Sequence, residues 1–212
     1  MPRPSLKDGY ESRLQLLQEV NRSLEQETKD SLEGLQHIDR ISFRVKSTDS
    51  FVEKAQDPEN DPPYSEPLVE IEDQIAGRVI VFFFRDLALV RDKLNRTFNA
   101  IEHSERRPAR DAEFGYESDH FICLIPPHAK PEGWDGRDDV PTTFELQVRT
   151  IFMHAYAEPQ HDLAYKGEKD LPRGIRRELA WIAASAWGAD QAYERVVEWA
   201  SHENSENKND TG

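Results

Sequence analysis

No run of consecutive apolar residues in the chain is longer than six residues, and Val79–Phe84 is a run of that length. A membrane-spanning helix needs about 20 apolar residues, so this run predicts a buried strand instead. Charged residues make up 32% of the chain, which also argues against a membrane-embedded protein. We therefore expect a globular protein with this strand in its core and no membrane partner.

Length and cysteine content narrow the class of protein further. The chain has 212 residues, which corresponds to one domain or one domain with appendages, and 37% of them are hydrophobic, enough for a core. The first residues contain no apolar signal segment. A single cysteine, Cys123, excludes an internal disulfide and a CxxC site. These features predict a cytoplasmic protein.

The formal net charge is −14, from 27 Lys and Arg against 41 Asp and Glu. Proteins that coat nucleic acid non-specifically depend on many cations that release phosphate counterions, so this charge argues against that class. A local basic pocket remains compatible with an acidic surface. The positions of the cations along the chain therefore matter more than their sum.

The spacing of apolar residues predicts both helices and strands. Helical spacing covers residues 10–35, 86–101, 150–165 and 175–200, and strand patterns cover 40–46, 78–85, 120–125 and 144–150. Residues 56–67 contain four prolines and predict a loop, and 102–115 are polar and rich in arginine. Because there is no regular βαβ rhythm and no glycine-rich phosphate loop, the pattern favours an α+β fold over a doubly wound one.

The segment Phe144–Thr150 alternates between apolar and polar residues. Phe144, Leu146 and Val148 are expected in the core, which leaves Glu145, Gln147 and Arg149 on the opposite face of the sheet. A carboxylate, an amide and a guanidinium in a row suit a metal-assisted phosphate site. The alternative is an ordinary solvated face of an antiparallel sheet.

Other segments add charged groups that favour the phosphate site. Asp73 lies just before the apolar strand, and the small residues Ala76 and Gly77 permit close approach to the backbone. Phosphoryl or pyrophosphoryl transfer requires carboxylates that hold Mg²⁺ and cations that neutralise the developing charge. The candidate cations are Arg44 and Lys46 on one strand, Lys54 at the far end of a short helix begun by Ser47 or Ser50, and Arg78.

A third element is the loop that contains Gly115 and Tyr116. The Tyr116 ring could stack on a nucleobase, or it could be a partly buried residue at the rim. Upstream, Arg106, Arg107 and Arg110 could contact phosphates or form a solvated turn.

Together these motifs resemble the synthetase domain of the RelA/SpoT family, the alarmone synthetases or GTP pyrophosphokinases. The motifs are Arg44-x-Lys46 with Lys54, Asp73 with Arg78, Gly115-Tyr-x-Ser-x-His120, Glu145-Leu-Gln-Val-Arg-Thr150 and His161-Asp-Leu-Ala-Tyr-Lys166. The resemblance runs from about Arg40 to Lys166. Nothing resembles the hydrolase or regulatory domains of longer members, so a small, synthetase-only member is expected. The resemblance implies a mixed, mostly antiparallel sheet flanked by helices, related to nucleotidyltransferases.

The family reaction moves the β,γ-pyrophosphate of ATP to the ribose 3′-hydroxyl of GDP or GTP and releases AMP. The resemblance implies that Asp73 and Glu145 bind Mg²⁺ and are catalytic, and that Glu145 helps to deprotonate the hydroxyl. Arg44 and Arg78 would enclose the adenine, and Lys46 and Lys54 would contact the ATP phosphates.

The implied acceptor-binding residues are Tyr116, stacked on guanine, and Ser118, His120, Gln147, Arg149 and His161. A metal site formed by His154, Glu158 and His161 is disfavoured.

The sequence departs from the family pattern in two places, and the first departure leaves the acceptor open. A Lys-Asp-Tyr element and a further lysine that contact the acceptor phosphates in many members are replaced by Glu105–Gly115, with arginines. A toxic branch that also lacks those lysines pyrophosphorylates the 3′ end of tRNA, and would imply an antitoxin partner. Pro159 is expected to kink its helix and to affect the position of His161. An inactive nucleotide-binding regulator is disfavoured by the intact Asp73 and Glu145.

We expect four segments in the chain: an N-terminal helical segment at 1–38, the synthetase domain at 39–170, a C-terminal helix at 171–200 and a disordered tail at 201–212. Small members of the family commonly form homotetramers through terminal helices. Three tryptophans on the last predicted helix, Trp181, Trp187 and Trp199, fit such an oligomer or the core of a monomer.

Overall fold

A computed structural model of the protein describes residues 5–106, 114, 118–164 and 171–209. The elements in chain order are α1 (Leu6–Glu11), α2 (Leu14–Ser31), β1 (Ile38–Val45), α3 (Thr48–Gln56), α4 (Pro67–Glu70), the 3₁₀ turn η1 (Glu72–Gln74), β2 (Ile75–Val81), α5 (Asp86–Thr97), β3 (Ala100–Arg106), β4 (Ser118–Leu124), the 3₁₀ turn η2 (Pro127–Ala129), β5 (Thr143–Thr150), α6 (Ile151–Ala164) and α7 (Arg173–Asn209).

The strands of the described residues form one sheet in the order β1-β2-β5-β4-β3. β2 and β5 pair in parallel, and the other three pairs are antiparallel. The mixed, mostly antiparallel α+β fold expected from the sequence is therefore confirmed. The last strand in the sequence, β5, lies at the centre of the sheet, between β2 and β4.

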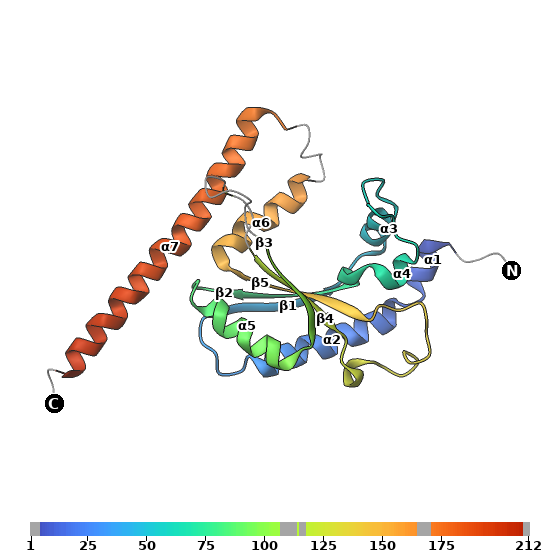
Figure 1. Ribbon diagram of the computed structural model, residues 1–212, viewed down its shortest axis with the longest axis horizontal. Helices are drawn as coiled ribbons and strands as arrows, with labels where there is room; N and C mark the ends of the chain where they lie inside the picture. Colours follow the sequence, from blue (N-terminus) through green and yellow to red (C-terminus); the bar gives the residue numbers. More distant parts are fainter. Residues whose placement is uncertain (1–4, 107–113, 115–117, 165–170, 210–212) are drawn as a thin grey trace.

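One face of the sheet is apolar because alternate residues of each strand point to the same side. Val79 on β2 and Leu146 and Val148 on β5 are completely buried there. Helices α2 and α5 cover this face (Figure 1). Leu17, on α2, is also completely buried. Each such aliphatic side chain contributes about 1.5–3 kcal/mol when it leaves water, so this layer is the main source of stability.

The opposite face carries polar residues and is flanked by α3 and α4 towards one end and by α6 towards the other (Figure 1). Helix α3 begins at the Ser47 cap, whose hydroxyl accepts a hydrogen bond from the Ser50 amide. Helix α6 begins directly after β5, and the Thr150 hydroxyl accepts a hydrogen bond from the Met153 amide at 3.1 Å. Both caps agree with the sequence expectation, and they fix two helices beside the polar face.

Several element boundaries differ from the sequence predictions. The segment predicted as one helix at 10–35 forms α1 and α2. The strand predicted at 78–85 spans Ile75–Val81, because the chain leaves the sheet before the half-exposed Phe82 and Phe84. β3 occupies part of the polar stretch 102–115, for which no strand was predicted.

One helix extends further than expected, because α7 continues to Asn209, where we expected a disordered tail from residue 201. Helix α6, predicted at 150–165, spans Ile151–Ala164 with Pro159 inside it. The division of the chain into four segments stays a prediction. None of the described helices combines the length and apolar composition that a membrane span requires.

Helix α7 contacts the rest of the protein near its middle, where the Tyr193 ring packs against Phe83 and Phe152 and two polar links form. Asp190 accepts a hydrogen bond from the Thr150 hydroxyl at 2.7 Å, and Glu194 pairs with Arg85 at 2.6 Å. The helix projects away from the sheet on either side of these links (Figure 1). Trp181 and Trp199, which lie on the two projecting parts, are 68% and 64% exposed.

Candidate active site

Asp73 lies in the 3₁₀ turn that leads into β2, at the edge of the polar face. The backbone amide of Lys46, which follows β1, donates to the Gln74 carbonyl at 2.8 Å, and this bond brings the two segments together. The Lys46 ammonium contacts Asp73 Oδ2 at 2.7 Å, and the Lys54 ammonium on α3 contacts Oδ1 at 2.9 Å. Three segments that are separate in the sequence thus form one charged cluster.

This cluster is partly buried, and its charges stabilise one another. Burial alone would raise the pKa of Asp73, but the two lysines outweigh it and hold the pKa below its usual value. Burial would similarly lower the pKa of Lys54, and the charge of Asp73 raises it instead. Asp73 and Lys54 are therefore both ionised at neutral pH.

Glu145 lies on β5, directly beside β2, where its backbone is in register with Ala76. Its Oε1 contacts His120 Nδ1 on β4 at 2.6 Å, and its Oε2 accepts a hydrogen bond from Gln147 Nε2 at 3.0 Å. Burial would raise the pKa of Glu145, but the bond to His120 contributes most to holding it below the usual value. Glu145 is thus a carboxylate with both oxygens positioned by neighbours.

Arg78 and Arg44 lie on the same face as Glu145. Arg78 on β2 is in register with Gln147, and Arg44 on β1 is in register with Ala76. Arg78 Nη1 contacts Glu158 Oε2 on α6 at 2.6 Å, while Arg44 is exposed. The two arginines therefore border the sheet surface between the Asp73 cluster and α6.

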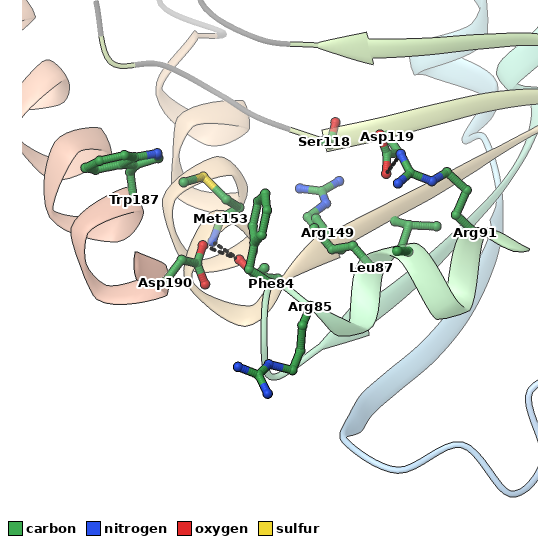
Figure 2. A pocket seen from close by; sticks show the side chains of 13 residues that line it. Phe84, Arg85, Leu87, Arg91, Ser118, Asp119, Arg149, Met153, Trp187 and Asp190 are labelled. Atoms are coloured by element: carbon green, nitrogen blue, oxygen red, sulfur yellow. Dashed lines mark hydrogen bonds and ion pairs between the residues drawn. The ribbon is translucent and has the colours of Figure 1, made fainter. Parts of the chain in front are cut away.

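Arg149 was expected to contact an acceptor, but its side chain is 1% exposed and donates to the amide oxygen of Gln147. It also lines a cavity of about 200 Å³ at the end of β5, with walls from β4, α5, α6 and α7 (Figure 2). Ser118, another predicted acceptor contact, lines the same cavity. The remaining walls include Phe84, Leu87, Arg91, Asp119, Met153, Trp187 and Asp190. Arg149 thus contacts Gln147 from two residues further along β5, and Gln147 in turn contacts Glu145.

The structure brings most of the predicted site residues to one face of the sheet. The set comprises Arg44, Lys46, Lys54, Asp73, Arg78, His120, Glu145 and Gln147. Tyr116, Arg107 and Arg110 lie outside the described residues, and so do the side chains of Arg106 and His161. Their predicted roles, and all the assigned roles of the set above, stay predictions.

Two contacts were not foreseen from the sequence. His120 was expected to bind the acceptor, yet it lies against the carboxylate of Glu145. Glu158 was considered only as a doubtful metal ligand, and it pairs with Arg78, with His154 Nδ1 at 3.6 Å from the same oxygen. Only the register of β4 on β5, and the position of α6 over β2, could have predicted these pairs.

The donor atoms suit a magnesium ion that is shared with a phosphate ligand. Asp73 and Glu145 offer hard carboxylate oxygens. The charge of Asp73 is close enough to Glu145 to raise its pKa, against the larger effects that lower it. In the part of the chain that the structure describes, no group of three or more His, Cys, Asp or Glu side chains could hold a metal. Because Mg²⁺ is usually bound by one or two carboxylates together with substrate phosphates, two carboxylates fit such a site.

Comparison with known proteins agrees with this geometry. The model of the "Region found in RelA / SpoT proteins" matches residues 43–170, more than half of the chain. The chain therefore belongs to the RelA/SpoT family. It is 29% identical over 164 residues to the GTP pyrophosphokinase YjbM of Bacillus subtilis (strain 168), which covers 75% of this chain and 72% of that protein.

Solved structures share the fold. A GTP pyrophosphokinase family protein from Streptococcus pneumoniae superposes with a TM-score of 0.74 at 22% identity, over 92% of this chain and 95% of that one. The small alarmone synthetase 1 of Bacillus subtilis, bound to its product pppGpp, gives a TM-score of 0.71 at 21% identity, over 89% and 96%. At these identities the likeness concerns the fold alone.

Proposed function

We propose that the protein is a Mg²⁺-dependent pyrophosphokinase that transfers the β,γ-pyrophosphate of ATP to the ribose 3′-hydroxyl of GDP or GTP, forming (p)ppGpp and AMP. The observation that carries this proposal is the meeting of Asp73 and Glu145 at adjacent strands, with Lys46 and Lys54 within 3 Å of Asp73. Membership of the RelA/SpoT family supports it, since a relative such as YjbM is a GTP pyrophosphokinase.

In this proposal the donor lies over β1 and β2. Arg44 and Arg78 enclose the adenine, and Lys46 and Lys54 contact the phosphates through their ammonium groups. Asp73 and Glu145 hold the Mg²⁺, which supplies charge neutralisation for the transferring group when it is bound. The paired contact of Arg78 with Glu158 at 2.6 Å keeps that guanidinium over the sheet.

The acceptor lies on the side of β4. Tyr116 stacks on its guanine, with Ser118, His120, Gln147, Arg149 and His161 as the further acceptor-side residues. Glu145 takes the proton of the 3′-hydroxyl as the 3′-oxygen attacks the β-phosphorus. The bond from that phosphorus to the oxygen bridging the α- and β-phosphates breaks, and AMP leaves. The lowered pKa of Glu145 keeps the carboxylate ionised and able to accept the proton.

Incubation of the purified protein with ATP labelled on the β-phosphate, in the presence of Mg²⁺ and GDP or GTP, tests the proposal. We expect a 3′-pyrophosphorylated guanine nucleotide and a stoichiometric amount of AMP. Labelling of deacylated tRNA without labelling of either nucleotide would show that the acceptor is wrong. The absence of any Mg²⁺-dependent turnover would favour an inactive nucleotide-binding regulator.

The arginines of the segment Glu105–Gly115 favour a second candidate, a toxic synthetase that pyrophosphorylates the 3′ end of tRNA. The net charge of −14 opposes it, because an acidic body repels a polyanion unless these arginines dominate locally. This candidate predicts growth arrest on expression that Glu145→Ala relieves, and an antitoxin partner. Equal growth with wild type and variant would count against it.

We also propose that the protein forms a homo-oligomer, specifically a tetramer, through its terminal helices. The exposed Trp181 and Trp199 on the projecting parts of α7 support this arrangement. Light scattering coupled to gel filtration should give a mass that is a multiple of the 24.5 kDa chain. Replacement of both tryptophans by glutamine should reduce that mass. A wild-type mass equal to that of a single chain would contradict the proposal.

A further inference from the structure

The carboxylate of Asp73 is enclosed by two ammonium groups. Lys46 Nζ lies 2.7 Å from Oδ2 and Lys54 Nζ lies 2.9 Å from Oδ1, so each oxygen has its own cation. The side chains of Lys46 and Asp73 are only 13% and 22% exposed. Solvent therefore screens these pairs less than it screens pairs on the surface. A cation that approaches Asp73 is repelled by both lysines at short range.

Glu145 is bound in a different way. Its oxygens contact His120 Nδ1 at 2.6 Å and Gln147 Nε2 at 3.0 Å. A carboxylate oxygen has two lone pairs, and an amide partner carries no net charge, so the Gln147 bond leaves Glu145 able to bind a cation. The two proposed metal ligands thus differ, because two ammonium groups neutralise Asp73 directly.

Lys46 and Lys54 are also the residues that we propose for the ATP phosphates. A lysine has three donors on a flexible four-carbon stem, so its ammonium can move from one anionic partner to another. A triphosphate carries more negative charge than one carboxylate and competes strongly for both lysines. Movement of the lysines onto the phosphates exposes Asp73 to a cation.

We propose that Lys46 and Lys54 form a clamp that keeps Asp73 closed to a free divalent cation and opens when a nucleoside triphosphate draws the ammonium groups away. Metal and nucleotide then bind cooperatively, and by thermodynamic linkage each raises the affinity for the other by the same factor. This proposal rests on the proposed function, because it uses the same lysines as phosphate contacts. It gives them a second role, which is to prevent metal binding before the nucleotide arrives.

Variant Lys54→Met tests the clamp, because Lys54 is the more exposed of the two lysines, at 38%, and its replacement leaves Lys46 in place. Without nucleotide, Mn²⁺ binding measured by electron paramagnetic resonance should be roughly tenfold tighter in this variant than in wild type, within the usual range of coupling factors. With EDTA present, binding of a methylene-bridged ATP analogue, measured by calorimetry, should be weaker. One substitution thus moves the two affinities in opposite directions.

Two further variants define the site of the change. Lys7→Met is the matched control, because Lys7 is 58% exposed and pairs with Asp49 rather than with Asp73. It should change neither affinity. In the double variant Lys54→Met with Asp73→Asn, the gain in Mn²⁺ affinity should disappear. Lys54→Gln provides the same test if thermal melting shows that Lys54→Met does not fold.

The outcomes separate this proposal from the proposed function, because neither measurement requires turnover. Unchanged or weaker Mn²⁺ binding by folded Lys54→Met would overturn the clamp, even in an enzyme that makes (p)ppGpp. Opposite shifts of the two affinities would support the clamp, even in a chain that transfers no pyrophosphate. A gain in Mn²⁺ affinity that persists in the double variant Lys54→Met with Asp73→Asn would locate the gained metal elsewhere and would also overturn it.

Discussion

The two faces of the sheet are formed by the same strands and differ in almost every property. On the face beneath α2 and α5, Leu146 and Val148 are completely buried among apolar side chains. On the opposite face, Glu145 and Gln147 take part in a row of charged and amide contacts. Neighbouring residues of β5 thus contribute either to packing or to chemistry, because alternate side chains of a strand point in opposite directions.

The candidate site therefore depends on strand register more than on loop conformation. Glu145 reaches His120 because β4 and β5 pair with Ile122 opposite Glu145 and His120 opposite Gln147. A shift of one residue would turn the carboxylate into the core and expose Leu146. The apolar face therefore fixes the register, and the register positions the polar face.

Glu145→Gln, a substitution on the polar face, should show the largest effect, and the effect should be on activity. We expect pyrophosphate transfer to fall by about 10²–10⁴-fold, because an amide cannot accept the hydroxyl proton. The stability of the fold should change little, since Gln retains the size of Glu. Initial rates with labelled ATP and urea unfolding measure the two quantities. Glu33→Gln, at an exposed position after α2, is the control, and near-normal activity of Glu145→Gln would contradict the assignment of the base.

Leu146→Ala, a substitution on the apolar face, should lower stability far more than activity. Leu146 is completely buried, and its truncation leaves a cavity that costs about 2–5 kcal/mol of unfolding free energy. At a temperature where the variant stays folded, activity should fall far less than in Glu145→Gln. Urea unfolding measures the loss, and Leu89→Ala, at a position that is 56% exposed, should lose far less. A stable but inactive Leu146→Ala would show that the two faces are not independent.

Gly77→Ala tests how closely the apolar face is packed. Gly77 was expected to permit close approach to the backbone, and the group that approaches it is the ring of Phe43, with Leu146 Cδ1 at 2.7 Å from the position of an added Cβ. Overpacking should cost about 1–3 kcal/mol of unfolding free energy. Gly174→Ala in α7, where a Cβ meets nothing within 4 Å, is the control for thermal melting. Equal stability of both variants would contradict the close packing.

The smallest effect should be a pH dependence of the unfolding free energy that comes from His154, near the polar face. Burial, followed by the charges of Arg149 and Arg78, holds the pKa of His154 below its usual value, against the opposing effect of Glu158. The unfolded chain then binds the proton more readily, so the contribution of His154 to stability is present above about pH 6.5 and is lost as the pH falls through its lowered pKa.

His154→Gln should remove that part of the pH dependence. Wild type should lose more unfolding free energy than the variant as the pH falls from 8 to 5. His128→Gln, at a position whose side chain is 65% exposed, serves as the comparison. Urea unfolding curves at several pH values measure the difference. Parallel pH profiles for wild type and His154→Gln would rule out this contribution.

Much of this architecture was predictable from local patterns. The alternation in Phe144–Thr150 correctly separated three core residues from three polar ones, because a strand at the centre of the sheet has one apolar face. β3 was not predicted, since it is an edge strand whose exposed residues, such as Ile101 and Glu102, give no clear apolar pattern. An edge strand gains less from burial, so its sequence is less constrained.

The site was predictable as a set of residue types but not as a set of contacts. The sequence indicated Asp73, Lys54 and Glu145 as charged groups near strands. It could not indicate that Arg149 would be buried and Gln147 less so, because both residues belong to the same polar row. It could not indicate the pair of Arg78 with Glu158 either, since that contact depends on where α6 crosses β2. Tertiary position, rather than local preference, decides these contacts.

The central position of β5 has a consequence for the order in which the protein is made. The ribosome synthesises β1 to β4 first, but β2 and β4 have no common partner until residues 143–150 appear between them. A growing chain that ends before Thr150 therefore has two incomplete half-sheets, with Asp73 on one and His120 on the other. Because domains generally fold as units during synthesis, the nascent chain completes the polar face with the proposed site in one late step. A fragment released before that step should have no enzymatic activity.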